Sequence, residues 1–219
     1  MEVKPVSVTG AARRAQIIEA TISVIAEQGY ERATFARIAE RAGISSTRLI
    51  SYHFAGKTDL MNAAAASVMA AISAWTGREV AAQAGAAAQL RAYIAATVQF
   101  IAENRAAMKA LTDILLAGVL DYTADEDGAA GAPLEEMLRR GQAQGEFRSF
   151  DPLVMAAAIQ RCVDGLPFLL EREPLLDCAA YARELATLFE LGTRSEPGTT
   201  RSGAPLPQAP SGVGGHPGS

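Results

Sequence analysis

The sequence is poor in the residues on which several protein classes depend. Cysteine and histidine occur twice each among 219 residues, and aromatic residues make up 6%. The two cysteines, Cys162 and Cys178, are too far apart for a C-x-x-C metal motif. We expect them to be reduced thiols of a cytoplasmic protein, packed as small hydrophobic side chains. No metal site and no cofactor are therefore expected.

Catalytic signatures are also missing from the sequence. One of the two histidines, His216, falls in a C-terminal segment rich in Gly, Pro and Ser, which leaves His53 as the histidine of the folded part. The sequence contains no G-x-S-x-G motif, no phosphate-binding loop and no cluster of metal-ligating residues. A catalytic constellation is hard to assemble from what is left, so the protein is not expected to be an enzyme.

Long apolar runs are absent as well. No run reaches about 18 residues without a polar interruption, so no transmembrane helix is expected. The first ten residues lack the apolar core of a signal peptide. Alanine is abundant, and no alternating run of β-branched residues stands out, which predicts an all-α fold.

Charge is distributed unevenly, although the net charge is −4. Residues 1–59 hold eight Lys or Arg against six Asp or Glu, whereas residues 60–219 hold twelve against eighteen. A slightly basic N-terminal part on an acidic remainder is consistent with a local DNA-contacting face.

The most informative stretch, residues 33–60, has the pattern of two short helices joined by a glycine turn. Apolar residues from Phe35 to Ala42 follow the i, i+3, i+4, i+7 spacing of one helix face, and Thr34 can cap that helix. Gly43 follows, where a helix end favours positive φ. Ser45 or Ser46 can cap a second helix that runs to about Phe54. This pattern predicts a helix-turn-helix, whose second helix enters the DNA major groove.

The pattern along the whole sequence predicts a flexible arm, a small head, a larger body and a tail. The arm is residues 1–10, the DNA-binding domain 11–58, the helical body 59–192, and the disordered tail 193–219. An acidic, glycine-containing loop is expected at 121–132, and a proline kink at Pro167. Outside the helix-turn-helix, helices are expected at 11–28, 57–83, 87–103, 105–120, 133–144, 152–172 and 175–191.

The first sixty residues resemble the TetR-type (tetracycline-repressor-like) transcriptional regulators. A helix that ends in glycine precedes the helix-turn-helix, and a Y-H-F-x-G-K segment then opens a long helix. The matching residues are Ile17, Ile18, Ala20, Gly29, Tyr30, Thr34, Ile38, Ala39, Ala42, Gly43, Ile44, Ser45, Leu49, Tyr52, Phe54, Lys57 and Leu60. The resemblance implies a three-helix DNA-binding head on a larger helical body that dimerises and binds a small molecule. The alanine- and arginine-rich composition is consistent with a bacterial source.

One departure from the family pattern lies in the recognition helix. Ile44 to Phe54 spans eleven residues, where the commonest pattern has ten. The extra residue, near Ser46, Thr47 and Arg48, either lengthens the turn or rotates the start of the helix by about 100°.

Polar residues of the predicted recognition helix and its neighbours are the candidate DNA contacts. Arg48 is the long cation of that helix, suited to guanine O6 and N7 or to a phosphate. The resemblance implies phosphate contacts for Tyr52 and Lys57, and the N-terminus of the long helix favours phosphate at Lys57. His53 is read either as a DNA contact or as a helix-end packing residue. The complete candidate set is Thr34, Arg37, Ser45, Ser46, Thr47, Arg48, Ser51, Tyr52, His53 and Lys57.

A homodimer and a ligand site complete the expected function. One recognition helix buries too little surface for tight specific binding, and the apolar helices over 152–191 are expected to join two copies. Asp164 is read as a ligand contact or as a partner of Arg161. Candidate ligand-lining residues are Trp75, Tyr93, Phe100, Met108, Leu111, Leu115, Met137, Asp164 and Phe168, each of which could equally be plain core.

These observations predict a ligand-responsive homodimeric regulator, most simply a repressor that a small-molecule effector releases from a palindromic double-stranded DNA operator. The alternative is a helical small-molecule-binding protein that has lost specific DNA binding.

Overall fold

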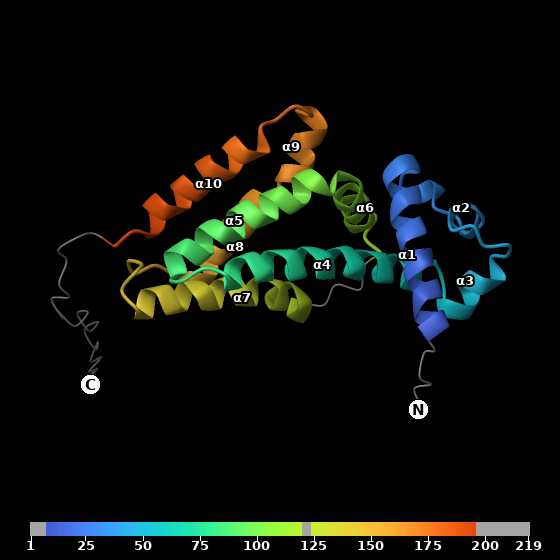
Figure 1. Ribbon diagram of the computed structural model, residues 1–219, viewed down its shortest axis with the longest axis horizontal. Helices are drawn as coiled ribbons and strands as arrows, with labels where there is room; N and C mark the ends of the chain where they lie inside the picture. Colours follow the sequence, from blue (N-terminus) through green and yellow to red (C-terminus); the bar gives the residue numbers. More distant parts are fainter. Residues whose placement is uncertain (1–7, 120–123, 196–219) are drawn as a thin grey trace, which may run out of the picture.

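The computed structural model describes residues 8–119 and 124–195, which form helices joined by turns and confirm the all-α class. The first four elements make up the head, which lies at one end of an elongated molecule (Figure 1). They are α1 (Val8–Gln28), the 3₁₀ turn η1 (Tyr30–Arg32), α2 (Phe35–Arg41) and α3 (Arg48–His53). The other helices make up the body: α4 (Lys57–Ala81), α5 (Ala86–Glu103), α6 (Arg105–Leu116), α7 (Ala124–Ala143), α8 (Pro152–Asp164), α9 (Leu166–Arg172) and α10 (Cys178–Thr193).

Two clusters of buried apolar side chains hold these helices together. The first runs from the head into the body, from Ile17, Ile38 and Ile50 to Leu60 and Ile114. The second lies in the part of the body remote from the head and comprises residues of α5, α7, α8 and α10 together with Phe147. Because the first cluster spans the boundary, head and body share a core around α1, α4 and α6.

The predicted helices differ from the observed ones mainly at their ends. α1 begins at Val8, so residues 8–10 of the predicted arm are helical, and residues 1–7 lie outside the described residues. Residues 194–195 of the predicted tail are described, and 196–219 lie outside the described residues. The predicted helix 152–172 is two helices, with the break at Gly165 rather than a kink at Pro167, which lies in the first turn of α9.

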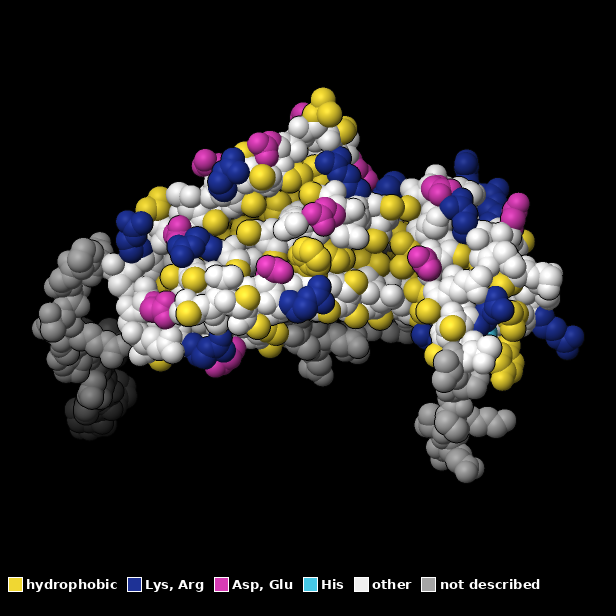
Figure 2. All heavy atoms as spheres, viewed as in Figure 1, with side chains coloured by type: hydrophobic (Ala, Val, Ile, Leu, Met, Phe, Trp, Pro, Cys, Tyr) yellow, Lys and Arg dark blue, Asp and Glu magenta, His cyan; other side chains and the backbone are white. Residues whose placement is uncertain are grey.

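Two segments were predicted wrongly. Part of the loop expected at 121–132 is helical, because α7 begins at Ala124 and contains Pro133. Alanine, the best helix former, here outweighs the glycines and the proline. The last helix begins at Cys178, capped by the Asp177 carboxylate, and Leu175 is 99% exposed instead of lying on a helix face. Hydrophobic side chains protrude at this turn between α9 and α10 (Figure 2).

The turn after α7 joins three parts of the body. Gly141 lies where a Cβ would be 2.2 Å from the Phe147 ring and 2.8 Å from Ala86 Cβ, so the ring can pack there only against glycine. Glu146 accepts a hydrogen bond from the backbone N–H of Ala87, 3.0 Å away, and so caps α5, which no residue of its own caps. Backbone hydrogen bonds from Ala87 and Ala86 lower the pKa of the Glu146 carboxyl.

Two spans of the body are apolar enough, by length and composition alone, to resemble membrane helices. The first is α4, in which 33% of the most apolar 18-residue segment is buried within the protein. The second is Pro152–Arg172, in which 28% of that segment is buried. Packed helices of soluble proteins pass the same test. On the Pro152–Arg172 span, Leu153, Val154 and Phe168 are large apolar side chains that face outward.

Candidate nucleic-acid interface

The helix-turn-helix is present, with a long turn. The Thr34 side chain accepts a hydrogen bond from the Arg37 N–H and caps α2, as predicted. Gly43 has φ +64°, and the Ile44 N–H then bonds to the Ala39 carbonyl, which directs the buried Ile44 side chain back to the core. α3 begins at Arg48, later than predicted, so residues 42–47 form the turn.

α3 presents a polar face to solvent and an apolar face to the core. Ile50 is completely buried and Leu49 is partly buried, so the opposite side of the helix is free of core contacts. The Arg48 N–H donates to Ser46 Oγ at 3.2 Å, which supports the first turn in place of a side-chain cap from Thr47. Exposed residues on the turn and this face are Ser45, Ser46, Thr47, Arg48, Ser51 and Tyr52.

Tyr52 and His53 form a pair at the end of α3. Tyr52 is 81% exposed, so its ring and hydroxyl are accessible from solvent. His53 is partly buried, and its ring meets the Tyr52 ring edge-on with centroids 5.1 Å apart. His53 therefore packs at the helix end, in line with the packing interpretation of this residue, and steadies Tyr52 from the side.

Lys57, the first residue of α4, is held by η1. Its ammonium lies 4.3 Å from the centroid of the Tyr30 ring, and Nζ is 3.4 Å from the Tyr30 carbonyl oxygen. Both contacts are attractive for a cation. The N-terminus of α4 has no side-chain cap from Gly56, and the Asp59 carboxylate instead accepts a hydrogen bond from the Ala55 N–H at 2.8 Å.

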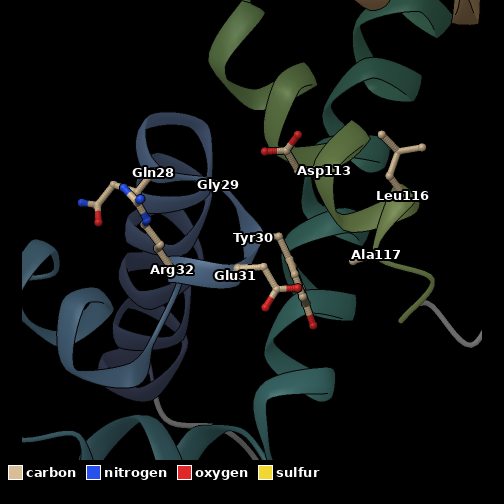
Figure 3. Close-up of a pocket in the computed structure, with 8 residues that line it drawn as sticks. All are labelled: Gln28, Gly29, Tyr30, Glu31, Arg32, Asp113, Leu116 and Ala117. Carbon is tan, nitrogen blue, oxygen red and sulfur yellow. The ribbon is translucent and has the colours of Figure 1, made fainter.

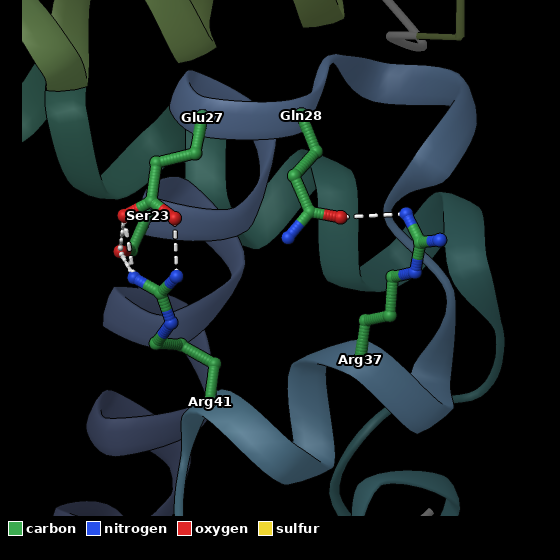
Figure 4. Close-up of polar contacts among 5 residues, drawn as sticks. All are labelled: Ser23, Glu27, Gln28, Arg37 and Arg41. Atoms are coloured by element: carbon green, nitrogen blue, oxygen red, sulfur yellow. Dashed lines mark hydrogen bonds and ion pairs between the residues drawn. The ribbon is translucent and has the colours of Figure 1, made fainter.

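Two arginines of α2 turn toward α1 (Figure 4). Arg37 Nη1 donates to Gln28 Oε1 at 2.6 Å, so this predicted DNA contact is engaged within the head. Arg41 donates to both carboxylate oxygens of Glu27 and to Ser23 Oγ, and the Arg41 hydrogen bond lowers the pKa of the Glu27 carboxyl. These contacts link α1 to α2. Sequence reasoning missed them because nothing in the spacing of residues on separate helices signals them.

An open cleft of about 570 Å³ lies between the η1 region and the C-terminal end of α6 (Figure 3). Tyr30 and Glu31 of η1 form one wall, and Asp113 and Leu116 of α6, with Ala117 just after it, form the other. Asp113 is paired with Lys109 on its own helix, with 2.9 Å between Nζ and Oδ2. The cleft lies where the head meets the body and includes Tyr30, which holds Lys57.

The predicted ligand-lining residues do not form one set. Trp75, Phe100, Met108 and Leu111 belong to or pack against the first apolar cluster, whereas Tyr93 and Met137 belong to or pack against the second. Leu115 and Phe168 are 45% and 46% exposed, so they do not line the protomer interior. On α6 the buried position next to Leu115 is taken by Ile114.

A polar chain links α5 to α8 in the body. Tyr93 donates its hydroxyl to Gln160 Oε1 at 2.5 Å, and Gln160 Nε2 donates to Asp164 Oδ1 at 2.7 Å. Asp164 also pairs with Arg161 at 3.6 Å, as one interpretation of the sequence expected. Burial, and secondarily the Asp164 charge, raise the pKa of Tyr93 to about 12, so the phenol stays a neutral hydrogen-bond donor at neutral pH.

The outer sides of α8 and α10 combine large apolar side chains with charged residues such as Arg161 and Arg183. Their inner sides share the second cluster through Ile159 and Phe189. Their outer sides carry large apolar residues that are each 60–65% exposed, namely Leu153, Val154, Leu188 and Leu191. Figure 2 shows one face of the body, where hydrophobic side chains lie between scattered charges.

Comparison with known proteins agrees with this architecture. Residues 17–64 match the family model described as "Bacterial regulatory proteins, tetR family". The HTH-type transcriptional regulator BetI of Paraburkholderia phymatum is 40% identical over 85 residues, which are 38% of this chain and 43% of that protein. The chain therefore spans less than half the length of this curated relative.

Solved structures are similar over nearly the whole fold. The fatty acid degradation regulator FadR from Bacillus halodurans superposes with a TM-score of 0.71 at 21% identity, covering 82% of this chain and 99% of that one. The transcriptional regulator FadR from Bacillus subtilis in complex with stearoyl-CoA gives 0.66 at 19% identity, covering 81% and 98%. The head of the chain is therefore similar to the tetR family of bacterial regulatory proteins, and the described residues share the overall fold of these solved regulators.

Proposed function

We propose that the protein is a homodimeric transcriptional regulator that binds a near-palindromic DNA site and releases it when the body binds a small molecule, and so acts as a repressor. The observation that carries the proposal is the exposed face of α3, which places Arg48, Ser51 and Tyr52 in solvent beside the N-terminus of α4. An α-helix with such a face fits the major groove, and a helix N-terminus attracts phosphate.

Each side chain has a role suited to its chemistry. Arg48 would donate to guanine O6 and N7, a contact worth roughly 1–3 kcal/mol of base discrimination. Tyr52 and Lys57 would donate to phosphates, which fix the register of the helix in the groove. Thr34 and Arg37 would approach the backbone from α2, Arg37 after leaving Gln28, while Ser45, Ser46 and Thr47 offer hydroxyls along the turn.

Two copies are required because α3 has few residues to offer. A dimer formed through α8 and α10 would bury the outward Leu153, Val154, Leu188 and Leu191, and a four-helix interface fits two such pairs. The two recognition helices would then need to lie about 34–36 Å apart, one turn of DNA.

Release by a ligand would act through α4, because this helix contacts both the head and the body. Its first residue, Lys57, contacts the head, and its last turns pack on α5 in the body. Consider a ligand that binds more tightly to the state in which α4 is displaced than to the state that binds DNA. At saturation it lowers DNA affinity by at most the ratio of its affinities for these two states. The stearoyl-CoA complex of the Bacillus subtilis FadR, with its similar fold, supports a body able to accept a small molecule.

The test is selection of genomic fragments by the purified full-length protein at near-physiological salt, read by sequencing. Enrichment of a palindrome supports the dimeric regulator and identifies the promoter it controls. Only salt-sensitive, sequence-independent binding would contradict it. The long turn before α3 would then be the physical reason, and the alternative of a small-molecule binder that has lost its DNA site would take its place.

A further inference from the structure

The body contains a buried hydrogen-bond donor for which the described part of the chain supplies no acceptor. Nε1 of Trp75, on α4, is shielded from solvent and has no hydrogen-bond partner among the residues that the structure describes. Leaving a buried N–H unpaired weakens a folded state by a factor of roughly 5–150 in its equilibrium constant. An acceptor from outside the chain would recover that factor.

Other polar groups of the α4 region do not compete for this role. The hydroxyls of Thr76 and Thr97 face each other across α4 and α5 at 3.5 Å. Asn62 Oδ1 is also buried without a partner, but the oxygen and nitrogen of an amide can be exchanged, whereas an indole N–H cannot. Asn62 also points roughly 140° away from Trp75 around the helix, so the two belong to different places.

The surroundings of Trp75 favour an uncharged molecule. The ring packs against the first apolar cluster, and the buried polar residues among those described are threonines, so no buried ionised group could neutralise a charge brought inside. The guanidinium of Arg78 lies 5.6 Å from the Trp75 ring centroid and is exposed. It covers the ring with positive charge, which opposes a cationic ligand at the same ring.

We propose that the body binds an uncharged, largely apolar molecule that carries a hydrogen-bond acceptor such as a carbonyl oxygen, and that Trp75 Nε1 donates to this acceptor. This inference rests on the proposed function, because it names the chemical class of the effector that would release DNA. In this proposal Trp75 makes the polar contact with the ligand, and the neighbouring apolar side chains contact the ligand's hydrocarbon part.

Trp75 is the single tryptophan of the sequence, so its fluorescence reports the site directly. Full-length protein is titrated with 2-heptanone, 2-nonanone and 2-undecanone, and with carboxylates and alkyltrimethylammonium ions of matching chain length. Saturable changes in emission are expected with the ketones, with affinity rising about fourfold per added methylene while the chain stays enclosed. Carboxylates and ammonium ions should bind at least roughly tenfold more weakly.

The hydrogen bond itself is tested with Trp75→Phe, followed by calorimetry because the fluorophore is lost. Affinity for 2-nonanone should fall roughly tenfold, since the ketone oxygen loses its donor. Tyr181→Phe is the matched control, because its hydroxyl already donates to the Cys162 carbonyl at 3.1 Å, and its ketone affinity should be unchanged. Circular dichroism and DNA binding of Trp75→Phe verify that the fold is intact.

The outcomes separate this inference from the proposed function. If no ketone binds, if charged probes bind equally well, or if Trp75→Phe retains full affinity, the assignment of Trp75 is wrong even when the protein selects a palindrome. If ketones bind through Trp75 but no DNA site is selected, the assignment stands and the regulatory function fails.

Discussion

Substituting Gly141 by alanine should destabilise the protein, although the same change usually strengthens a helix. A Cβ built on Gly141 lies 2.2 Å from Phe147 Cδ2, 2.4 Å from Cε2 and 2.8 Å from Ala86 Cβ. Real Cβ atoms essentially never approach other atoms closer than 3.0 Å. The Phe147 ring is 5% exposed, so it cannot swing away without leaving the second apolar cluster.

The expected magnitude combines two opposing effects. Alanine gains about 0.8–1.0 kcal/mol of helix propensity over glycine. Overpacking a filled core costs about 1–3 kcal/mol, and expelling an aromatic ring from the cluster costs more. The net loss for Gly141→Ala should therefore be roughly 1–3 kcal/mol in the free energy of unfolding.

Urea denaturation followed by circular dichroism, at one fixed protomer concentration, measures this loss. Gly77→Ala is the matched control, because Gly77 lies exposed within α4 and a Cβ there meets nothing within 4 Å. It should stabilise the protein by roughly 0.5–1 kcal/mol. Equal effects of the two substitutions, or a stabilised Gly141→Ala, would refute the packing argument. A Phe147→Ala background should abolish most of the penalty of Gly141→Ala, because the two sites interact directly.

Three further perturbations test other parts of the structure. Glu146→Gln should lower stability at neutral pH. The pKa of Glu146 in the folded protein lies below its ordinary value of 4.5. The stabilisation by its carboxylate is therefore complete above pH 4.5 and is lost as the pH falls through the folded pKa. Denaturation of both proteins from pH 7 to pH 3 should show the difference vanishing, and a constant difference would exclude the charged cap. Lys57→Gln should reduce the salt dependence of DNA affinity by about one unit of slope per protomer, measured by fluorescence anisotropy, whereas Lys109→Gln on α6 should leave the slope unchanged. Leu188→Glu should weaken the dimer by roughly 3 kcal/mol or more in sedimentation equilibrium, while Leu116→Glu, which is 73% exposed away from α8 and α10, should not.

The head was largely predictable from sequence, because its helices are short-range patterns with strong end signals. Thr34 caps α2, Gly43 takes positive φ, and the core face of α2 contains Ile38 and Ala39, all as the spacing indicates. The start of α3 was not predictable. Ser45, Ser46 and Thr47 all favour a helix N-terminus, so sequence alone could not choose which of them ends the turn.

The body was less predictable, because its long helices are rich in alanine, which does not distinguish the buried face of a helix from the exposed one. The exposure of Leu115, Phe168 and Leu175 depends on how neighbouring helices cross, which periodicity does not encode. Pairings such as Tyr30 with Lys57 bring together side chains far apart in sequence. The unpaired indole N–H of Trp75 is a property of the packed interior and has no signature in the sequence.

The turn after α7 has a consequence for how the chain is made. The start of α5 is completed by Glu146, 59 positions after Ala87. The Arg148 N–H bonds in turn to the carbonyl of Thr193 at the end of α10, 2.9 Å away. A chain emerging from the ribosome cannot finish this junction until its last helix is available. The helices of the head all precede residue 54, so they can form early, but the core that α1 shares with α6 also waits for residues 105–116.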